Sequence, residues 1–374
     1  FSGLQIGSFF ATMGIASLFM PAVMGIIADR WIPAQRLLGL CHLFAAGFIT
    51  LAATRTDYNS LYTLVLLSVM FYMPTIALSN SVAYNALEKA GLDTVTHFPP
   101  IRVWGTVGFI CAMWVVDLGK MGLSATQLYF SATLGLILGL YSFTLPNCPI
   151  NRSGGGKSIV DLLGLRAFAL FKQRKMAIFF IFSMLLGMSL QITNAFADGY
   201  IKSFGDTGIH GAKYLGTFGV EHSTILISLS QISETLCILL IPFFLKRFGI
   251  KRVMLIAMFA WVLRFALLGA GNPGPGVWMF ILSMIVYGVA FDFFNISGSL
   301  FVEKETSAAI RSSAQGVFMI MTNGLGALIG SYLAGWVVNH YGWPLSWYLF
   351  AGFSLVVAIV FAVIFKYKHD PNRI

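Results

Sequence analysis

Two short basic turns organise this sequence: ADRWIPAQR at residues 28–36 and LKRFGIKR at residues 245–252. Each turn joins two apolar segments that are long enough to cross a bilayer as helices, which takes about 20 mostly apolar residues. The turns lie six apolar segments apart. This repeat predicts an all-α, polytopic membrane protein built from two similar halves.

The same length criterion predicts eleven membrane-spanning segments in the whole chain. They cover residues 4–27, 37–54, 61–84, 101–118, 127–145, 176–200, 222–244, 253–270, 277–299, 313–338 and 345–367. Two halves of six helices would need one more helix before Phe1, so we expect the numbering to begin inside a longer natural protein. The predicted units are an N-terminal helical bundle (1–145), a cytoplasmic linker (146–175) and a C-terminal helical bundle (176–374).

The composition favours a membrane protein over a soluble one. The chain is 57% hydrophobic and only 10% charged, whereas soluble proteins carry roughly 25% charged residues. Its net charge of +10 does not indicate nucleic acid as a partner, because the basic residues fall in alternate loops and not on one face. The four cysteines show neither CxxC nor Cys/His spacing. We expect at least three of them to be buried apolar filler.

The basic residues also predict the orientation, because cytoplasmic loops are enriched in Lys and Arg. One set of alternate loops and the C-terminal tail hold most of them, namely Arg30, Arg36, Lys89, Arg152, Lys157, Arg166, Lys172, Arg174, Lys175, Lys246, Arg247, Lys251, Arg252, Lys304, Arg311, Lys366, Lys368 and Arg373. The opposite loops hold only Arg55, Lys120, Lys202 and Lys213. We therefore expect a cytoplasmic C-terminus and an external Phe1.

Two carboxylates, Glu234 and Asp292, lie in the middle of predicted spans. A charge in hydrocarbon costs several kcal/mol, so such residues usually mark a substrate or ion pathway. A buried carboxyl group can also carry a proton, because burial disfavours its charged form. We expect one of the two, with Asp292 preferred, to couple transport to protons. A carboxylate that only bridges two helices is the structural alternative.

Amide and aromatic side chains share helical faces with these acids, since residues three or four apart are neighbours. The groups are Gln191 with Asn194, Gln231 with Glu234, and Tyr287 with Phe291, Asp292 and Asn295. Each could instead serve helix packing.

A further helical face carries Arg102, Thr106 and Phe109. There Arg102 either faces a central cavity or reaches back to the interface, as long basic side chains do. Arg264 is the one basic residue well inside a predicted span, and an ion pair with Glu234 or Asp292 would explain it as well as a functional role would.

Two glycine-rich motifs are given structural interpretations. GGGKS at residues 154–158 lacks the glycine that a phosphate-binding loop needs where Asn151 stands, so we expect a flexible linker. GALIG at residues 326–330 allows close helix approach, which we expect to be used within the chain. We find no nucleophile–base pair, metal cluster or cofactor loop, so the sequence predicts neither an enzyme nor a metal or cofactor.

Several stretches resemble known families. GIIADR at residues 25–30 resembles the loop signature of the major facilitator superfamily, with Gly25, Asp29 and Arg30 as a gating motif. Four more resemble the nucleoside:proton symporter family, the bacterial nucleoside permeases of that superfamily: FPPIRVWGT (98–106), LQITN (190–194), SQISET (230–235) and AFDFFNISG (290–298). The similarity covers nearly the whole chain.

The resemblance implies the major facilitator superfamily fold, with twelve helices in two pseudo-symmetric bundles, the first helix lying before Phe1. It implies proton-coupled nucleoside uptake across the bacterial inner membrane by alternating access. It carries over a nucleoside site made of Arg102, Thr106, Phe109, Gln191, Asn194, Gln231, Glu234, Tyr287, Phe291 and Asp292.

The expected partners are a purine or pyrimidine nucleoside, a proton and the lipid bilayer, and we expect a monomer. Amides and acids suit the ribose hydroxyls and the edge of the base, while the aromatic rings can stack on the base. Two alternatives remain: a proton-coupled transporter of another polar solute, such as an oligosaccharide or a drug, and a membrane protein that senses nucleosides without transporting them.

Overall fold

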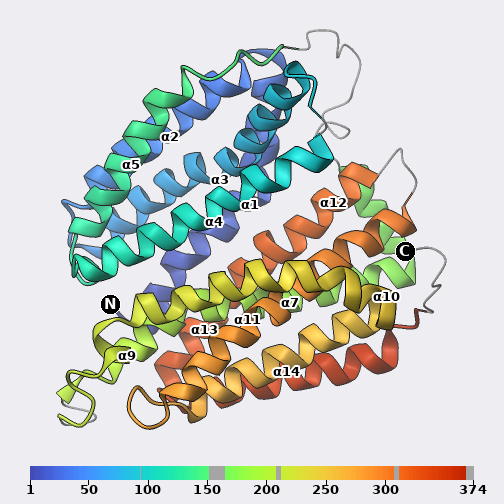
Figure 1. Ribbon diagram of the computed structural model, residues 1–374. Coiled ribbons are helices and arrows are strands. Elements are labelled where there is room, and N and C mark those ends of the chain that lie inside the picture. The colour runs from blue at the N-terminus through green and yellow to red at the C-terminus, as the bar shows by residue number, and fades with distance from the viewer. Residues whose placement is uncertain (93, 151–164, 208–211, 307–310, 368–374) are drawn as a thin grey trace.

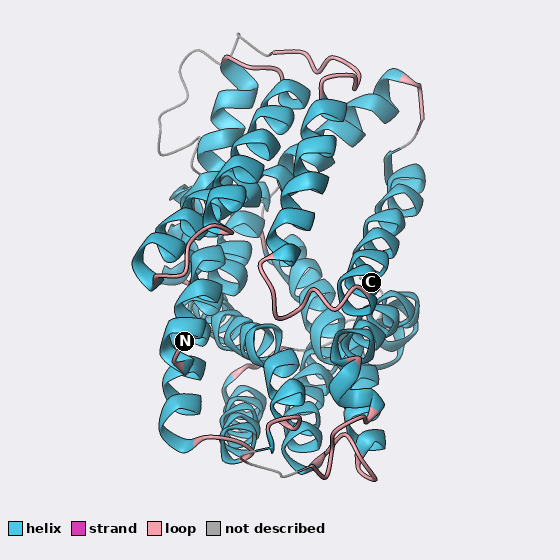
Figure 2. Ribbon diagram, turned by 90° about the vertical axis from the view of Figure 1, so that its left-hand side faces the viewer, coloured by secondary structure: helices cyan, strands magenta, loops and turns pink. Residues whose placement is uncertain are grey.

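The computed structural model describes residues 1–92, 94–150, 165–207, 212–306 and 311–367. Helices are the regular structure throughout this part of the chain, and the loops connect them (Figure 2). The first five helices are α1 (Gly3–Arg30), α2 (Ala34–Ala52), α3 (Tyr58–Lys89), α4 (Thr94–Leu118) and α5 (Thr126–Ser142).

The second group begins with the short 3₁₀ helix η1 (Leu165–Lys172). It continues with α7 (Arg174–Ser203), α9 (Phe218–Glu221), α10 (Ser223–Ala270), α11 (Val277–Glu305), α12 (Arg311–Met319), η2 (Ile320–Gly326), α13 (Ala327–Tyr341) and α14 (Leu345–Ile364). The segment η2 is a π-helix that joins α12 directly to α13.

All the predicted spans correspond to helices. Nine helices in the described residues are long and apolar enough to cross a membrane. One of them, the 48-residue α10, contains two spans, because its backbone turns at Gly249 with φ 75° and ψ 166°, a conformation that glycine adopts without steric cost. The 17-residue α5 corresponds to the remaining span. The predicted all-α, polytopic fold is therefore confirmed.

The helices form two groups that lie side by side (Figure 1). Helices α1 to α5 make one group and α7 to α14 the other, and they meet where α1 packs on α13 and η2 and where α4 packs on α10. The predicted domain limits 1–145, 146–175 and 176–374 stay a prediction, because residues 151–164 of the linker, with the GGGKS motif, lie outside the described residues.

Glycines allow very close helix crossings between α7 and the α12–α13 rod. A Cβ on Gly326 would lie 2.6 Å from the Met184 carbonyl oxygen, and one on Gly330 would lie 2.7 Å from the Met188 Cα. A Cβ on Gly187 would overlap the backbone of Thr322. The GALIG motif thus packs within the chain, as its sequence predicted.

The two groups of helices also meet through polar contacts near the end of α4. His222 Nδ1 lies 2.6 Å from Asp117 Oδ2, and the Thr224 amide donates to Asp117 Oδ1 at 3.2 Å. Trp114 Nε1 donates to Ser228 Oγ at 2.9 Å. These contacts join α4 to the start of α10. The cysteines agree with expectation: three are buried and only Cys111 is exposed.

The Gly187 crossing makes a testable prediction about stability. We expect Gly187→Ala to lower the Tm of the purified protein, because its methyl group would collide with the Thr322 backbone and overpacking costs about 1–3 kcal/mol. Gly352→Ala in α14 is the matched control, since a Cβ there meets nothing within 4 Å. Equal Tm values for the two variants would contradict the packing described here.

Candidate functional site

The two predicted acids come from neighbouring helices and lie in one cluster. Glu234 is on the first half of α10 and Asp292 is on α11, and these two helices pack closely at Gly288, where a Cβ would lie 2.6 Å from the Ser233 carbonyl oxygen. The Asp292 side chain is buried with 3% exposure, and Glu234 is half-buried. The two carboxyl groups interact electrostatically. The structure therefore brings both acids together, as the sequence predicted.

Two polar atoms in this region are buried without a hydrogen-bond partner among the described residues. They are Oδ2 of Asp292 and Nε2 of Gln191. Leaving a buried polar group unpaired costs about 1–3 kcal/mol, so a bound water, ion or ligand often satisfies such a group. Asp292 Oδ2 can bind a proton or accept a hydrogen bond, and Gln191 Nε2 can donate one to a substrate or to water.

Arg264 stabilises the cluster without neutralising it. Its Nε and Nη2 donate to Thr193 Oγ1 at 3.1 and 2.9 Å, and its Nη1 donates to the Ser283 carbonyl oxygen at 2.6 Å. The guanidinium lies 4.7 Å from the centre of the Tyr287 ring. Within the described residues it forms no ion pair with either acid. The ion pair with Glu234 or Asp292, which the sequence left open as one explanation of Arg264, is therefore not formed, because hydroxyl, carbonyl and aromatic groups bind this cation instead.

The aromatic strip of α11 lies against this arginine. The Tyr287 ring stacks on Phe291 at 5.9 Å and meets Trp261 edge-on at 6.1 Å. The Asn194 side chain of α7, which is exposed, interacts electrostatically with the Tyr287 side chain. The strip thus serves packing at Tyr287 and stays partly accessible at Phe291.

The residues from α4 approach from the other group of helices. Arg102 is exposed and its charge interacts with Glu234, so its side chain is not used only at the membrane interface. Thr106 is half-buried and Phe109 is 52% exposed. In the described part of the chain, Thr106, Phe109 and Gln231 make no side-chain hydrogen bond, ring contact or ion pair with the acid cluster.

The predicted gating motif lies at the end of α1, away from this cluster in sequence. Gly25 is half-buried and has open space where a Cβ would stand. The side chains of Asp29 and Arg30 lie outside the described part of the structure. Their gating role stays a prediction.

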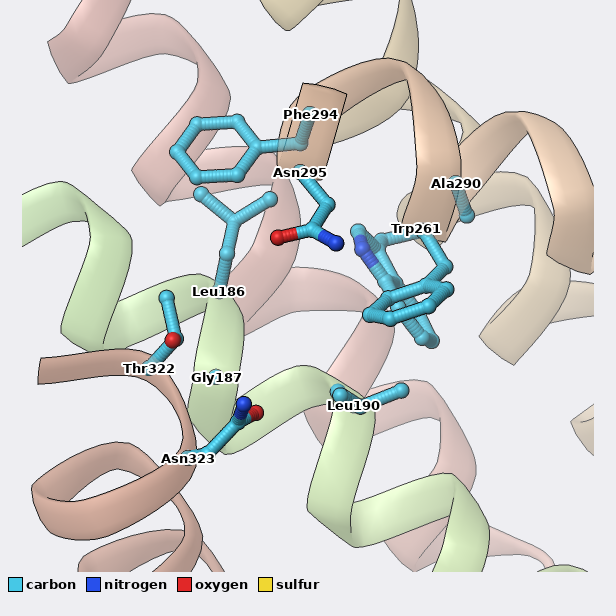
Figure 3. A pocket seen from close by; sticks show the side chains of 10 residues that line it. Leu186, Gly187, Leu190, Trp261, Ala290, Phe294, Asn295, Thr322 and Asn323 are labelled. Atoms are coloured by element: carbon cyan, nitrogen blue, oxygen red, sulfur yellow. The ribbon is translucent and has the colours of Figure 1, made fainter. Parts of the chain in front are cut away.

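A small pocket opens beside the cluster. Its walls come from α7, α10, α11 and η2 (Figure 3), and they comprise Leu186, Gly187, Leu190, Trp261, Ala290, Phe291, Phe294, Asn295, Thr322 and Asn323. Of the predicted site residues only Phe291 lines it. The sequence analysis missed Trp261, Thr322 and Asn323, although the polar pair Thr322–Asn323 in the middle of a predicted span was a usable signal.

A family model described as nucleoside H+ symporter matches residues 1–370. The chain belongs to this family. It is 50% identical over 376 residues to the nucleoside permease NupG of Escherichia coli (strain K12), covering 99% of this chain and 89% of that protein. It is 49% identical over 381 residues to the xanthosine permease of the same strain, covering 100% and 90%. A crystal structure of a NupG variant matches with TM-score 0.94 and 50% identity, covering 98% of this chain and 92% of that one.

These matches confirm the resemblance and the major facilitator fold. The symporter-family chain is a multi-pass bacterial membrane protein, and its relatives are permeases and not enzymes. None of the matches assigns a role to an individual residue, so the ten predicted nucleoside contacts and the proton carrier remain predictions.

Arg264 offers a test of how this symporter site is supported. We expect Arg264→Lys to lower the stability by about 2 kcal/mol, because lysine keeps the charge but loses the planar fork that binds Thr193 and stacks on Tyr287. Thermal unfolding of the purified variant would measure this, with Arg252→Lys on the exposed basic turn as the matched control. A variant as stable as the control would show that the fork is dispensable.

Proposed function

We propose that this protein takes up nucleosides together with protons, and that the cluster on α7, α10 and α11 is its binding site. The observation that carries the proposal is the pair of acids, Glu234 and Asp292, together with Asp292 Oδ2 and Gln191 Nε2, two buried atoms that have no hydrogen-bond partner among the described residues. Membership of the nucleoside H+ symporter family supports the choice of both solutes.

The site offers the two kinds of contact that a nucleoside needs. Gln191, Asn194, Gln231 and Glu234 can exchange hydrogen bonds with ribose hydroxyls, and Phe291 presents a partly accessible ring for stacking. On the opposite side, α4 contributes Arg102, Thr106 and Phe109. A site built to bond hydroxyls discriminates against analogues that lack them, because its own buried groups are then left unpaired.

Asp292 is the proposed proton carrier. Its carboxylate is more deeply buried than that of Glu234, and one of its oxygens has no partner in the described structure. Two neighbouring carboxylates repel each other when both are charged, so a single proton relieves this repulsion. Because Arg264 is bound elsewhere, it does not supply the compensating charge. A proton bound from outside can then travel with the substrate while the two groups of helices rock about the site.

The coupling is tested by uptake of radiolabelled uridine and adenosine into proteoliposomes under an imposed pH gradient, acid outside. We expect the wild-type protein to accumulate nucleoside above the outside concentration and to lose this when the gradient is collapsed. Asp292→Asn should reduce accumulation at least tenfold, because the amide binds no proton at these pH values. The variant should still exchange nucleoside between the two sides of the membrane.

Glu221→Gln, at an exposed carboxylate next to α10, is the control and should transport normally. If the wild-type protein accumulates nucleoside equally with and without the pH gradient, proton symport is wrong. Binding without any flux in the wild-type protein would instead support a nucleoside sensor.

The proposed orientation places the C-terminus in the cytoplasm of a bacterial inner-membrane protein. Basic residues gather at the C-terminal end of the molecule: Lys175 Nζ lies 2.5 Å from Glu305 Oε2 and 5.5 Å from the Tyr367 ring centre, and Lys251 Nζ donates to the Ala362 carbonyl oxygen at 3.0 Å. The N-terminus lies at the other end of the molecule (Figure 1). We further propose a monomer, because the GALIG face is already covered by α7.

Labelling of intact cells with a membrane-impermeant maleimide tests the orientation. In a Cys111→Ser background, we expect Lys213→Cys to react from outside and Lys246→Cys to react only after the cells are opened, because both side chains are exposed but lie in loops assigned to opposite sides. The reverse labelling pattern would overturn the assignment.

A further inference from the structure

The start of α10 is capped by a residue from the other group of helices. His222 is the N-cap residue of α10, but its side chain makes no capping bond to its own helix. Instead Asp117, at the end of α4, accepts the Thr224 amide with its Oδ1 at 3.2 Å. An N-cap side chain usually makes this bond within its own helix, and the helix dipole favours a negative charge there. The capping of α10 therefore depends on α4.

Asp117 binds the opposite group of helices with both of its carboxylate oxygens. His222 Nδ1 lies 2.6 Å from Oδ2, while Oδ1 accepts the Thr224 amide. Only 3% of the Asp117 side chain is exposed, and both of its hydrogen bonds within the described residues cross between the groups. If α4 moves away from α10, this carboxylate loses these partners and has to be hydrated instead.

Within its own group, the start of α10 is held in place by α7. Asp198 Oδ1 accepts the Ser223 hydroxyl at 2.7 Å and the Thr224 hydroxyl at 3.3 Å, and its Oδ2 pairs with Lys202 Nζ at 2.6 Å. Thr224 thus bonds to its own group through its hydroxyl and to the other group through its amide. Asp117 is therefore the part of this contact that leaves when the two groups separate.

Further contacts between the groups lie at the same end of the molecule. Trp114 Nε1 donates to Ser228 Oγ at 2.9 Å, and a Cβ on Gly122, in the loop after α4, would lie 2.9 Å from Lys202 Nζ. From this end the ribbons of α4 and α10 diverge (Figure 1), and Arg102, nearer the start of α4, is exposed. The proposed orientation places the joined end outside the cell.

We propose that the contact of Asp117 with His222 and Thr224 is an outer gate. It holds the outer ends of α4 and α10 together, and it has to break before a nucleoside enters from outside. The inference rests on the proposed nucleoside uptake and adds to it the residues that keep the outer side closed. Because the two bonds exist only while the helices touch, they favour the outward-closed state over the outward-open one, and their removal shifts this equilibrium.

Spin labels on the two groups of helices test the outer gate. Leu123→Cys and Leu215→Cys place the labels on exposed loops of different groups, in a Cys111→Ser background whose other cysteines are buried. Double electron–electron resonance on the purified protein gives the ratio of the longer, open distance to the shorter, closed one. We expect Asp117→Ala to raise this ratio about fivefold, because the variant loses two bonds that only the closed state makes.

Asp57→Ala is the matched control. Asp57 also caps a helix, because its Oδ2 accepts the Ser60 amide at the start of α3 at 2.8 Å, but both residues belong to the same group. Its loss should leave the distance ratio unchanged. His222→Ala removes one bond of the gate from the other side and should raise the ratio about threefold, which keeps the proposal testable if Asp117→Ala does not fold.

The outcomes separate the outer gate from the proposed function. If neither Asp117→Ala nor His222→Ala changes the distance ratio, the gate is wrong, even in a protein that carries nucleosides. Equal shifts in Asp117→Ala and Asp57→Ala would overturn it as well, because a general loss of helix capping would then be the cause. If the expected shifts occur but the wild-type protein carries no nucleoside in proteoliposomes, the gate stands and the proposed substrate is wrong.

Discussion

The close approach of α10 and α11 at Gly288 is the constraint on which the site depends. A side chain at this position would collide with Ser233, and the helices would separate. Without one, Glu234 and Asp292 lie close enough for their charges to interact at membrane depth. Charges at this depth are costly unless they meet a partner, a proton or a water-filled cavity. The packing of the two helices thus places two carboxylates where their repulsion is costly, and a coupled proton can relieve that repulsion.

Arg264 does not neutralise the two carboxylates, although it is buried near them. A buried arginine beside two acids would ordinarily form an ion pair, and a buried pair is hard to separate because each charge is left unpaired. Here Thr193, the Ser283 carbonyl and the Tyr287 ring take up the guanidinium. The acids are left to respond to protons, while the same arginine holds the Tyr287 ring of the aromatic strip.

Much of the fold could be predicted from sequence, because hydropathy over about 20 residues reports directly on membrane crossing. Glu234 and Asp292 could be found for the same reason, since charges stand out in apolar runs. The pair Thr322–Asn323 stands out in an apolar run, but the pocket that it shares with Trp261 could not be predicted, because it depends on a π-helix that no periodicity reveals and on which helices touch. The partners of Arg264 could not be decided from sequence either, because an acid and a functional role explained the charge equally well, whereas neutral groups from α7 and α11 bind it in the structure.

The two contacts between the groups of helices differ in the kind of interaction that holds them. Where α1 meets α13, Gly7 and Gly14 allow the two backbones to touch. Separating these helices would therefore lose close packing. Where α4 meets α10, Asp117 and Trp114 make a few hydrogen bonds that water can replace at little net free energy. A rocking motion that keeps the α1–α13 contact and separates α4 from α10 would open the central site on the α4–α10 side only. Solutes would then enter between these two helices.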